Sequence, residues 1–248
     1  MSRMYSERVG NISAVRGCSH FCSYCAFRTS LRRSSCVKCR SFEIHTHVEV
    51  LKRNPPRTKD NEFLTVGLTG DISFASDEVI RLIIAYCAQW SDRTFLLQSK
   101  NPARFIETDG TGTQKFYFPS NVILGCTLET NYSLIPSASA EGEYVLYNTI
   151  SKAPDPVLRV EAMEKIRDNR KIVTIEPVLN FDPETLKYMI EAINPMAVYI
   201  GYDSGGHKLP ESPLQKTLDF IESIKATTQV RQKLMRPAWF EQSVRTDA

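Results

Sequence analysis

The sequence predicts a single-domain α/β protein, residues 1–248, in which parallel strands form a partial (β/α)6 TIM-like barrel. Three observations predict this class. Short apolar segments rich in β-branched residues alternate with segments of helical spacing after residue 60. Each strand precedes a helix, which indicates parallel strands covered on the outside, as in a doubly wound sheet or a barrel. Six such units can be counted, and six units favour the open barrel.

Six strands are expected along the chain. Each is a short apolar segment, and most end at Gly, Ser, Thr, Asp or Glu. Their ranges are 9–17, 62–70, 93–99, 120–129, 171–178 and 196–202.

Five helices are expected between or after these strands, at 77–90, 101–107, 154–169, 182–194 and 212–228. The helix at 154–169 is predicted by the helical spacing of its apolar residues, which are Val157, Leu158, Ala162, Met163 and Ile166. The helix at 182–194 should begin with Asp182 as its N-cap and Pro183 in its first position. By contrast, residues 131–153 show little periodicity, and we expect an irregular loop that contacts substrate through Tyr144, Tyr147 and Asn148.

Polar residues follow most of the predicted strands. In parallel β/α folds the carboxyl ends of the strands form one rim, and functional residues lie there. The cysteine-rich loop after the first strand occupies the same position, so it should meet these residues on that rim. The rim candidates are Gly70, Asp71, Ser99, Lys100, Thr127, Glu129, Glu176 and Tyr202.

Composition favours a cytoplasmic protein without a membrane span. The formal net charge is +3, and no apolar run approaches the ~18 residues that a transmembrane helix needs. The first residues also lack the apolar stretch of a signal peptide. In such a chain, five of seven cysteines clustered between Cys18 and Cys39 indicate metal binding more than disulfides. Cys87 and Cys126 lie in apolar segments and are expected to be buried small hydrophobes.

Three cysteines lie within eight residues in "RGCSHFCSYCAF", which spans residues 16–27. Cys18, Cys22 and Cys25 have the spacing C-x3-C-x2-C, with Tyr24 just before the third. Free thiols and half of a zinc site are the alternatives to an iron–sulfur cluster. His20, between two of the cysteines, is expected to be exposed.

This triplet, in the loop after a first strand and at the head of a β/α chain, resembles the radical S-adenosylmethionine (SAM) superfamily. The segments "FLLQSKNPARF", "NVILGCTLET" and "KIVTIEPVLNFD" are similar to a branch found in phages and archaea, and spore photoproduct lyase has a similar cysteine spacing. The resemblance implies a [4Fe–4S] cluster on Cys18, Cys22 and Cys25, with SAM on the fourth iron. It implies reductive cleavage of SAM to a 5′-deoxyadenosyl radical that abstracts hydrogen from substrate, with flavodoxin or ferredoxin as electron donor.

The resemblance also implies roles for the rim residues. Thr69-Gly70-Asp71 stands where many relatives have Gly-Gly-Glu, so Asp71 would accept from the SAM amino group. Lys100 would pair with the SAM carboxylate near Ser99, while Thr127 and Glu129 would bind ribose or the amino acid portion. Glu176 would be a structural anchor or a ligand contact, and Tyr24 and Tyr202 would also line the cofactor site. Incidental rim salt bridges are the alternative for Lys100 and Glu129.

A second group of metal-binding residue types lies in an insertion at about 30–50. Cys36, Cys39, His45 and His47 form a Cys-x2-Cys followed by a His-x-His. In an extended segment the two histidines would point to the same side. This group could bind zinc, hold an auxiliary iron–sulfur cluster, or carry no metal at all, and the sequence leaves these three alternatives open.

Charge is uneven along the chain. Residues 1–60 carry twelve Lys and Arg against four acidic residues, which gives this part +8 while the whole chain carries +3. Such a basic region could attract a nucleic-acid substrate, or it could be an ordinary solvated face. Two functions of other classes therefore stand beside the radical SAM enzyme. One is a zinc-stabilised nucleic-acid-binding protein, and the other is an iron–sulfur electron carrier.

Overall fold

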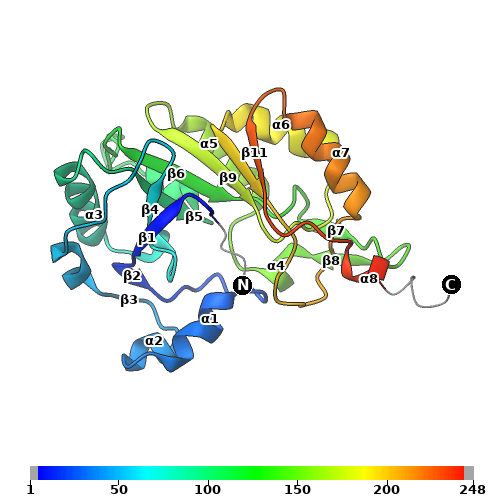
Figure 1. Ribbon diagram of the computed structural model, residues 1–248, viewed down its shortest axis with the longest axis horizontal. Coiled ribbons are helices and arrows are strands. Elements are labelled where there is room, and N and C mark those ends of the chain that lie inside the picture. The colour runs from blue at the N-terminus through cyan, green and yellow to red at the C-terminus, as the bar shows by residue number, and fades with distance from the viewer. Residues whose placement is uncertain (1–4, 243–248) are drawn as a thin grey trace.

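The computed structural model describes residues 5–242, and its centre is a seven-stranded sheet in which all neighbouring strands are parallel. The sheet curls into a half-barrel (Figure 1). Strand order follows chain order, so every connection steps in the same direction along the sheet. The strands are β1 (Arg8–Ile12), β4 (Phe63–Val66), β5 (Phe95–Ser99), β6 (Val122–Thr127), β9 (Arg170–Ile175), β10 (Ala197–Ile200) and β11 (Gln229–Gln232).

The sequence predicts six of these strands and misses β11. Its sequence, "QVRQ", has one apolar residue, and three of its four residues are exposed at the edge of the sheet. The strand is held by backbone pairing with β10, from Ala197–Gln229 to Ile200–Gln232. The backbone hydrogen bonds of an edge strand form without apolar side chains. The hydrophobic pattern of the sequence therefore does not predict β11.

Four longer helices follow the sheet strands: α3 (Asp77–Gln89), α5 (Pro156–Lys165), α6 (Pro183–Ile193) and α7 (Leu214–Ile224). The predicted cap of α6 is confirmed, because the Asp182 carboxylate accepts from the Thr185 N–H at 2.9 Å. The helix expected at 101–107 is a 3-10 helix, η4 (Pro102–Ile106). Within residues 5–242, none of the helices combines the length and apolar character that crossing a bilayer requires.

The remaining elements are short and lie in the connections. The segment expected to be irregular contains a hairpin, β7 (Leu134–Pro136) and β8 (Tyr144–Leu146), followed by α4 (Tyr147–Ile150). Within it, Tyr144 is exposed as a contact residue would be, whereas Tyr147 is buried. The others are β2 (Val15–Arg16), α1 (Ala26–Ser30), η1 (Leu31–Arg33), α2 (Val37–Ser41), β3 (His45–Thr46), η2 (Val48–Lys52), η3 (Ile72–Phe74) and α8 (Trp239–Gln242).

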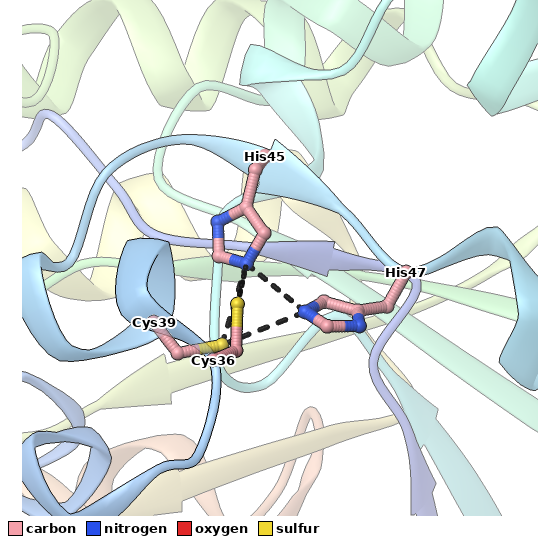
Figure 2. A group of neighbouring side chains, drawn as sticks. All are labelled: Cys36, Cys39, His45 and His47. Carbon is pink, nitrogen blue, oxygen red and sulfur yellow. Dashed lines mark hydrogen bonds between the residues drawn. The ribbon is translucent and has the colours of Figure 1, made fainter.

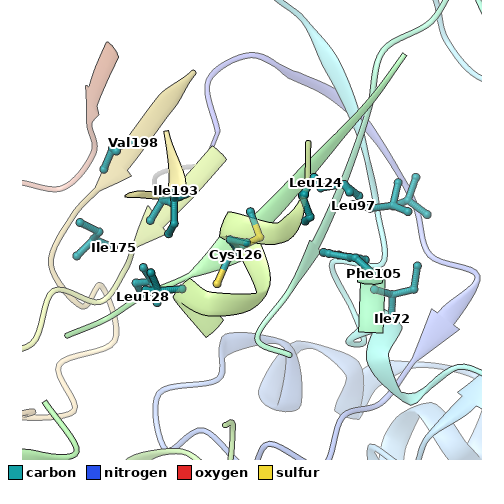
Figure 3. Close-up of a cluster of buried hydrophobic side chains, with 14 of the residues drawn as sticks. Ile72, Leu97, Phe105, Leu124, Cys126, Leu128, Ile175, Ile193 and Val198 are labelled. Carbon is teal, nitrogen blue, oxygen red and sulfur yellow. The ribbon is translucent and has the colours of Figure 1, made fainter. Parts of the chain in front are cut away.

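The main core lies between the sheet and the helices that cover it (Figure 3). Strand residues such as Leu97, Leu124 and Ile175 meet helix residues such as Ile193 there. Cys87 and Cys126 belong to this cluster and are inaccessible to solvent, which confirms that they are buried. Their thiols therefore act as small apolar side chains.

The opposite face of the sheet changes character along the strands. Near the amino ends it is apolar, where Tyr5 packs against Phe63 and Tyr199. Closer to the carboxyl ends of β5 and β6, the side-chain amide of Gln98 donates to the Thr127 hydroxyl at 2.8 Å. This face thus runs from an apolar floor to polar side chains toward the carboxyl ends of the strands.

Candidate functional site

The cysteine loop is held against the sheet by backbone hydrogen bonds on two sides. Gly17 N–H donates to the Thr69 carbonyl at 3.1 Å, and Gly17 and Gly70 form an isolated parallel bridge just beyond β4. On the other side, Ser23 N–H donates to the Ile150 carbonyl at 2.9 Å, at the end of α4. The loop therefore lies at the carboxyl edge of the sheet, as its place after the first strand predicts.

Gly17 is required at the start of this loop for two reasons. Its φ is +76°, and a Cβ there would lie 1.9 Å from the Glu43 carbonyl oxygen. Gly112 provides a matched control, because its φ is +85° and a Cβ added there would have no neighbour within 4 Å. The two glycines thus share the left-handed backbone and differ in crowding.

We expect Gly17→Ala to lower the free energy of unfolding by about 1–3 kcal/mol more than Gly112→Ala. Both variants meet the left-handed penalty of about 1–2 kcal/mol, but only the first forces two backbone segments apart. Urea titrations of the two variants measure the difference. Equal losses would show that the contact with Glu43 relaxes without cost.

The three thiols of the loop are unpaired and unequally covered. Cys22 is buried, whereas Cys18 and Cys25 are partly exposed. The Cys22 sulfur lies 3.2 Å from the Ser151 hydroxyl, and the Cys18 sulfur accepts from the His20 N–H at 3.4 Å. Burial, and then the negative charge of Asp71, raise the pKa of Cys18 to about 12. A bound cation would have to stabilise the thiolate form of this residue.

The loop offers donors of the type that an iron–sulfur cluster uses. Cluster irons are held by cysteine thiolates, and all three thiols here are free of disulfides. In the part of the chain that the structure describes, they do not form a compact group around one point, the arrangement that a single ion needs. A cluster is larger than one ion and binds its thiolates at separate corners, so the donor chemistry of the three thiols is compatible with the group.

Asp71 is the centre of a buried hydrogen-bond network beside the loop. Oδ1 accepts from the Ser99 hydroxyl at 2.6 Å and from the Ser73 N–H at 2.9 Å. Oδ2 accepts from the Lys100 N–H at 2.7 Å and lies 3.2 Å from His20 Nε2. Burial opposes the charged form, but these donors outweigh it and lower the pKa of Asp71 to about 2. Every acceptor position of this carboxylate is therefore used within the chain.

His20 was expected to be exposed, and this prediction is wrong. Only 4% of the residue is accessible, and its ring packs against Phe74 at 4.8 Å between centroids. The hydrogen bond to Asp71 compensates the burial of its polar ring. His20 thus fastens the cysteine loop to the segment that follows β4, through Asp71 and Phe74.

A second buried network surrounds Glu129, which is inaccessible to solvent. Arg159 Nη1 donates to its carboxylate at 2.9 Å, and the Tyr147 hydroxyl donates at 3.0 Å. Lys100 and Tyr24 donate to the other carboxylate oxygen. Lys100 Nζ also donates to the Tyr24 hydroxyl at 2.7 Å. Tyr24 lies between Cys22 and Cys25, so this network reaches the cysteine loop directly.

The network contains two cations for one carboxylate. Burial opposes the charged forms, but the neighbouring opposite charges outweigh it, so the pKa of Glu129 is lowered and those of Lys100 and Arg159 are raised. Burial and the charge of Glu129 raise the pKa of Tyr147 to about 12, which keeps its phenol neutral. The network itself carries one excess positive charge, and the buried carboxylate of Asp71, which accepts from the Lys100 N–H, balances it.

Arg159 belongs to this site although no sequence pattern pointed to it. The apolar pattern of its helix includes Val157 and Leu158, but these are 43% and 55% exposed, while Arg159 is inaccessible. The ion pair with Glu129 and a bond to the Thr127 carbonyl at 2.8 Å draw this side chain inward. The apolar pattern thus does not mark the buried face at the start of this helix, because a buried carboxylate needs a partner more than two aliphatic residues need burial.

Side chains of the other predicted rim residues have partners outside this network. The Thr127 hydroxyl accepts from the Gln98 side chain. Glu176 forms an ion pair with Lys233, which directly follows β11. Burial raises the pKa of Glu176. Tyr202 is in the main core, where its hydroxyl donates to the Ser212 carbonyl at 2.8 Å. Tyr202 therefore supports the start of α7, and its hydroxyl is bonded within the core and not to the other candidates.

The four residues of the second group come together as their spacing predicts. Figure 2 shows the sulfurs of Cys36 and Cys39 and the Nε2 atoms of His45 and His47 pointing toward one another. All four donor atoms lie within 4.8 Å of one another. The two Nε2 atoms are 3.0 Å apart, and the Cys39 sulfur is 3.3 Å from His45 and 3.6 Å from His47. Cys36 lies 3.6 Å from His45.

The surroundings of this group favour ligation. His45 Nδ1 lies 2.8 Å from the Glu43 carbonyl, and His47 Nδ1 lies 2.7 Å from the Glu49 carboxylate. The hydrogen bond from the Cys39 N–H lowers the pKa of Cys36 to about 6. Hydrogen bonds with the side chains of His47, Cys39 and His45 contribute less. This shift favours the thiolate of Cys36, the form that binds a metal.

A scan of the chain against protein-family models finds no match, and a search of curated proteins finds none either.

Proposed function

We propose that the chain is a radical SAM enzyme whose [4Fe–4S] cluster is held by Cys18, Cys22 and Cys25. The observation that carries the proposal is the position of three unpaired thiols on one loop, at the carboxyl edge of a curled parallel sheet. Ligands of parallel β/α folds bind at this edge. We assign the partial (β/α)6 barrel as the frame of the site, with β11 as an added edge strand.

When bound, the reduced cluster supplies the electron that cleaves SAM to methionine and a 5′-deoxyadenosyl radical, which abstracts hydrogen from substrate. The residues of the chain would bind and orient the cofactor. An ammonium has three donors, and Lys100 uses two of them on Tyr24 and Glu129. The third would bind the SAM carboxylate in a charge-assisted hydrogen bond.

Two of the roles implied by resemblance change in this proposal. Asp71 and Glu129 were expected to contact SAM, but their oxygens already accept from donors of the chain. We assign both as positioning residues. Asp71 holds the backbone of Lys100 and the ring of His20, and Glu129 holds the ammonium of Lys100. Thr127, bonded through its hydroxyl to Gln98, stays a candidate for the ribose.

The charge distribution supports an anionic substrate such as a nucleic acid or a nucleotide. Arg32, Arg33, Lys38 and Arg40 are exposed in the segment that follows the cysteine loop. Phe21, at the tip of the loop, is 57% exposed, and the Arg28 guanidinium lies 5.0 Å from its ring centroid. Exposed aromatic rings next to cations are typical of surfaces that stack nucleobases and neutralise phosphates.

The competing function is a nucleic-acid-binding protein in which all five clustered cysteines hold zinc. One observation favours part of it, since Cys36 and Cys39 join two histidines in a compact group. The same group excludes Cys18, Cys22 and Cys25, which leaves three thiols for another ligand. The two sites are therefore separable by experiment.

Anaerobic reconstitution with iron and sulfide tests the proposal. We expect about four irons per chain, a change in the electron paramagnetic resonance spectrum of the reduced cluster when SAM is added, and formation of 5′-deoxyadenosine. A cluster that does not respond to SAM would support an electron carrier instead. Zinc without any bound iron would support the nucleic-acid-binding protein.

A further inference from the structure

We propose that Cys36, Cys39, His45 and His47 bind one Zn²⁺ in a closed tetrahedral site that fastens α2 to the β2–β3 ribbon at the start of the cysteine loop. The site itself does not depend on the proposed radical chemistry. Only its consequence for the loop rests on that function.

The donor spacing matches a tetrahedral zinc ion. Bonds of about 2.3 Å to sulfur and about 2.05 Å to nitrogen place two nitrogens about 3.3 Å apart, and a nitrogen and a sulfur about 3.6 Å apart. The nitrogens are 3.0 Å apart, three of the four nitrogen–sulfur pairs are 3.3 to 3.6 Å apart, and all donor atoms lie within 4.8 Å of one another. The four donors therefore already surround a point at which one zinc ion fits.

The chemistry of the donors selects zinc among common ions. Two thiolates and two imidazoles are soft and borderline ligands, whereas Mg²⁺ and Ca²⁺ need oxygen ligands. Four protein donors fill a tetrahedral coordination sphere, which is the pattern of structural and not catalytic zinc sites. The group is thus expected to hold its ion without an open position for substrate.

The outer contacts of the two histidines orient them for this role. The Nδ1 atom of each is occupied, by the Glu43 carbonyl for His45 and by the Glu49 carboxylate for His47. Such contacts fix the tautomer that leaves Nε2 free to ligate and raise the basicity of the ring. Both Nε2 atoms face the two sulfurs.

The segment around the site lacks the apolar burial that would hold it in place. Across α1, η1 and α2, Cys39 is the one buried residue. A segment of this length without a hydrophobic core needs another source of stability, and metal binding can supply it. The buried residue of the segment is itself a ligand of the proposed site.

The site connects directly to the start of the cysteine loop. His45 pairs with Arg16 in the two-stranded β2–β3 ribbon, and His47 N–H donates to the Ala14 carbonyl at 2.8 Å. Gly17 and Cys18 follow immediately after Arg16. The ion would therefore tie α2 to the ribbon that positions the first cysteine of the loop.

Metal analysis tests the proposal. The chain purified without added metal should contain about one zinc, and Cys36→Ser and His45→Ala should each lower this at least about tenfold. His207→Ala is the matched control and should retain zinc, because His207 pairs with Asp203 in a different part of the fold. Retention of zinc by Cys36→Ser, absence of zinc from the wild-type chain, or iron at these four residues would each overturn the proposal.

Two further measurements guard against variants that do not fold. Cobalt replacing zinc in the wild-type chain should give the intense visible bands of tetrahedral Co²⁺ and a thiolate charge-transfer band, and weak octahedral bands would contradict the site. Removal of zinc by a chelator should increase proteolytic cleavage within residues 26–47 about tenfold, and unchanged cleavage would contradict its structural role. A Cys18→Ala/Cys22→Ala/Cys25→Ala variant should keep its zinc, so failure of the radical function would leave this result intact.

Discussion

Replacement of Cys22 by alanine should reduce the formation of 5′-deoxyadenosine to the background level and release the cluster iron. A cluster with three thiolate ligands keeps one iron open for SAM, and removal of one thiolate leaves two protein ligands. Of the three thiols, Cys22 is the buried one, and its sulfur lies 3.2 Å from the Ser151 hydroxyl. We therefore expect its loss to have the largest effect among the cysteine variants. Iron and sulfide analysis with chromatography of the reaction products measures both effects.

Cys87→Ala is the matched control for this experiment. It removes a thiol of the main core that contacts neither network, so it should retain iron and activity. Circular dichroism of the Cys22→Ala variant should match that of the wild-type chain, which would show that the loss is not caused by unfolding. Wild-type activity of Cys22→Ala would contradict the assignment of the cluster to these three cysteines.

Glu129→Gln should lower the free energy of unfolding by about 3–5 kcal/mol, the cost of leaving buried charges without their partner. The carboxylate is the only anion among the five residues of its network, and its loss leaves Lys100 and Arg159 buried together. Arg159→Met should cost less, because Glu129 keeps Lys100 as a counter-charge. Guanidinium titrations of the two variants test this order.

Glu141→Gln is the surface control, since Glu141 is exposed, and we expect a change within about 0.5 kcal/mol. A loss below about 1 kcal/mol in Glu129→Gln would show that water reaches the network. The reverse order, with Arg159→Met more costly, would show that Lys100 does not depend on Glu129. Either result would contradict the positioning role that we assign to Glu129.

Local patterns in the sequence predicted most of the frame. The strands β4, β5, β6 and β10 were found because they are buried along nearly their whole length and are mainly apolar. The strand β9 was found because its last four residues are buried and include three aliphatic side chains. The Cys/His group was found because its four donors lie within twelve residues, where a short helix and an extended segment suffice to bring them together.

The polar networks were only partly predicted. Asp71 and Ser99 were recognised as rim residues, but the bond between them joins positions 28 residues apart in the sequence. Arg159 and His20 were missed, because a charged or polar side chain in a helix or a loop normally faces solvent. Their burial depends on partners, Glu129 and Asp71, that the fold brings to them.

The sequence by itself determined the order of strands and helices, the loop that carries three cysteines, and the residues of the Cys/His group. These features depend on residue type and on spacing of a few residues, which act before the chain folds. The tertiary structure alone decided which charges are buried, that the acceptors of Asp71 and Glu129 are filled, and that Tyr202 supports the core. Burial and pairing of polar groups are set by neighbours distant in sequence, because a buried charge is stable only where the whole fold supplies its partner.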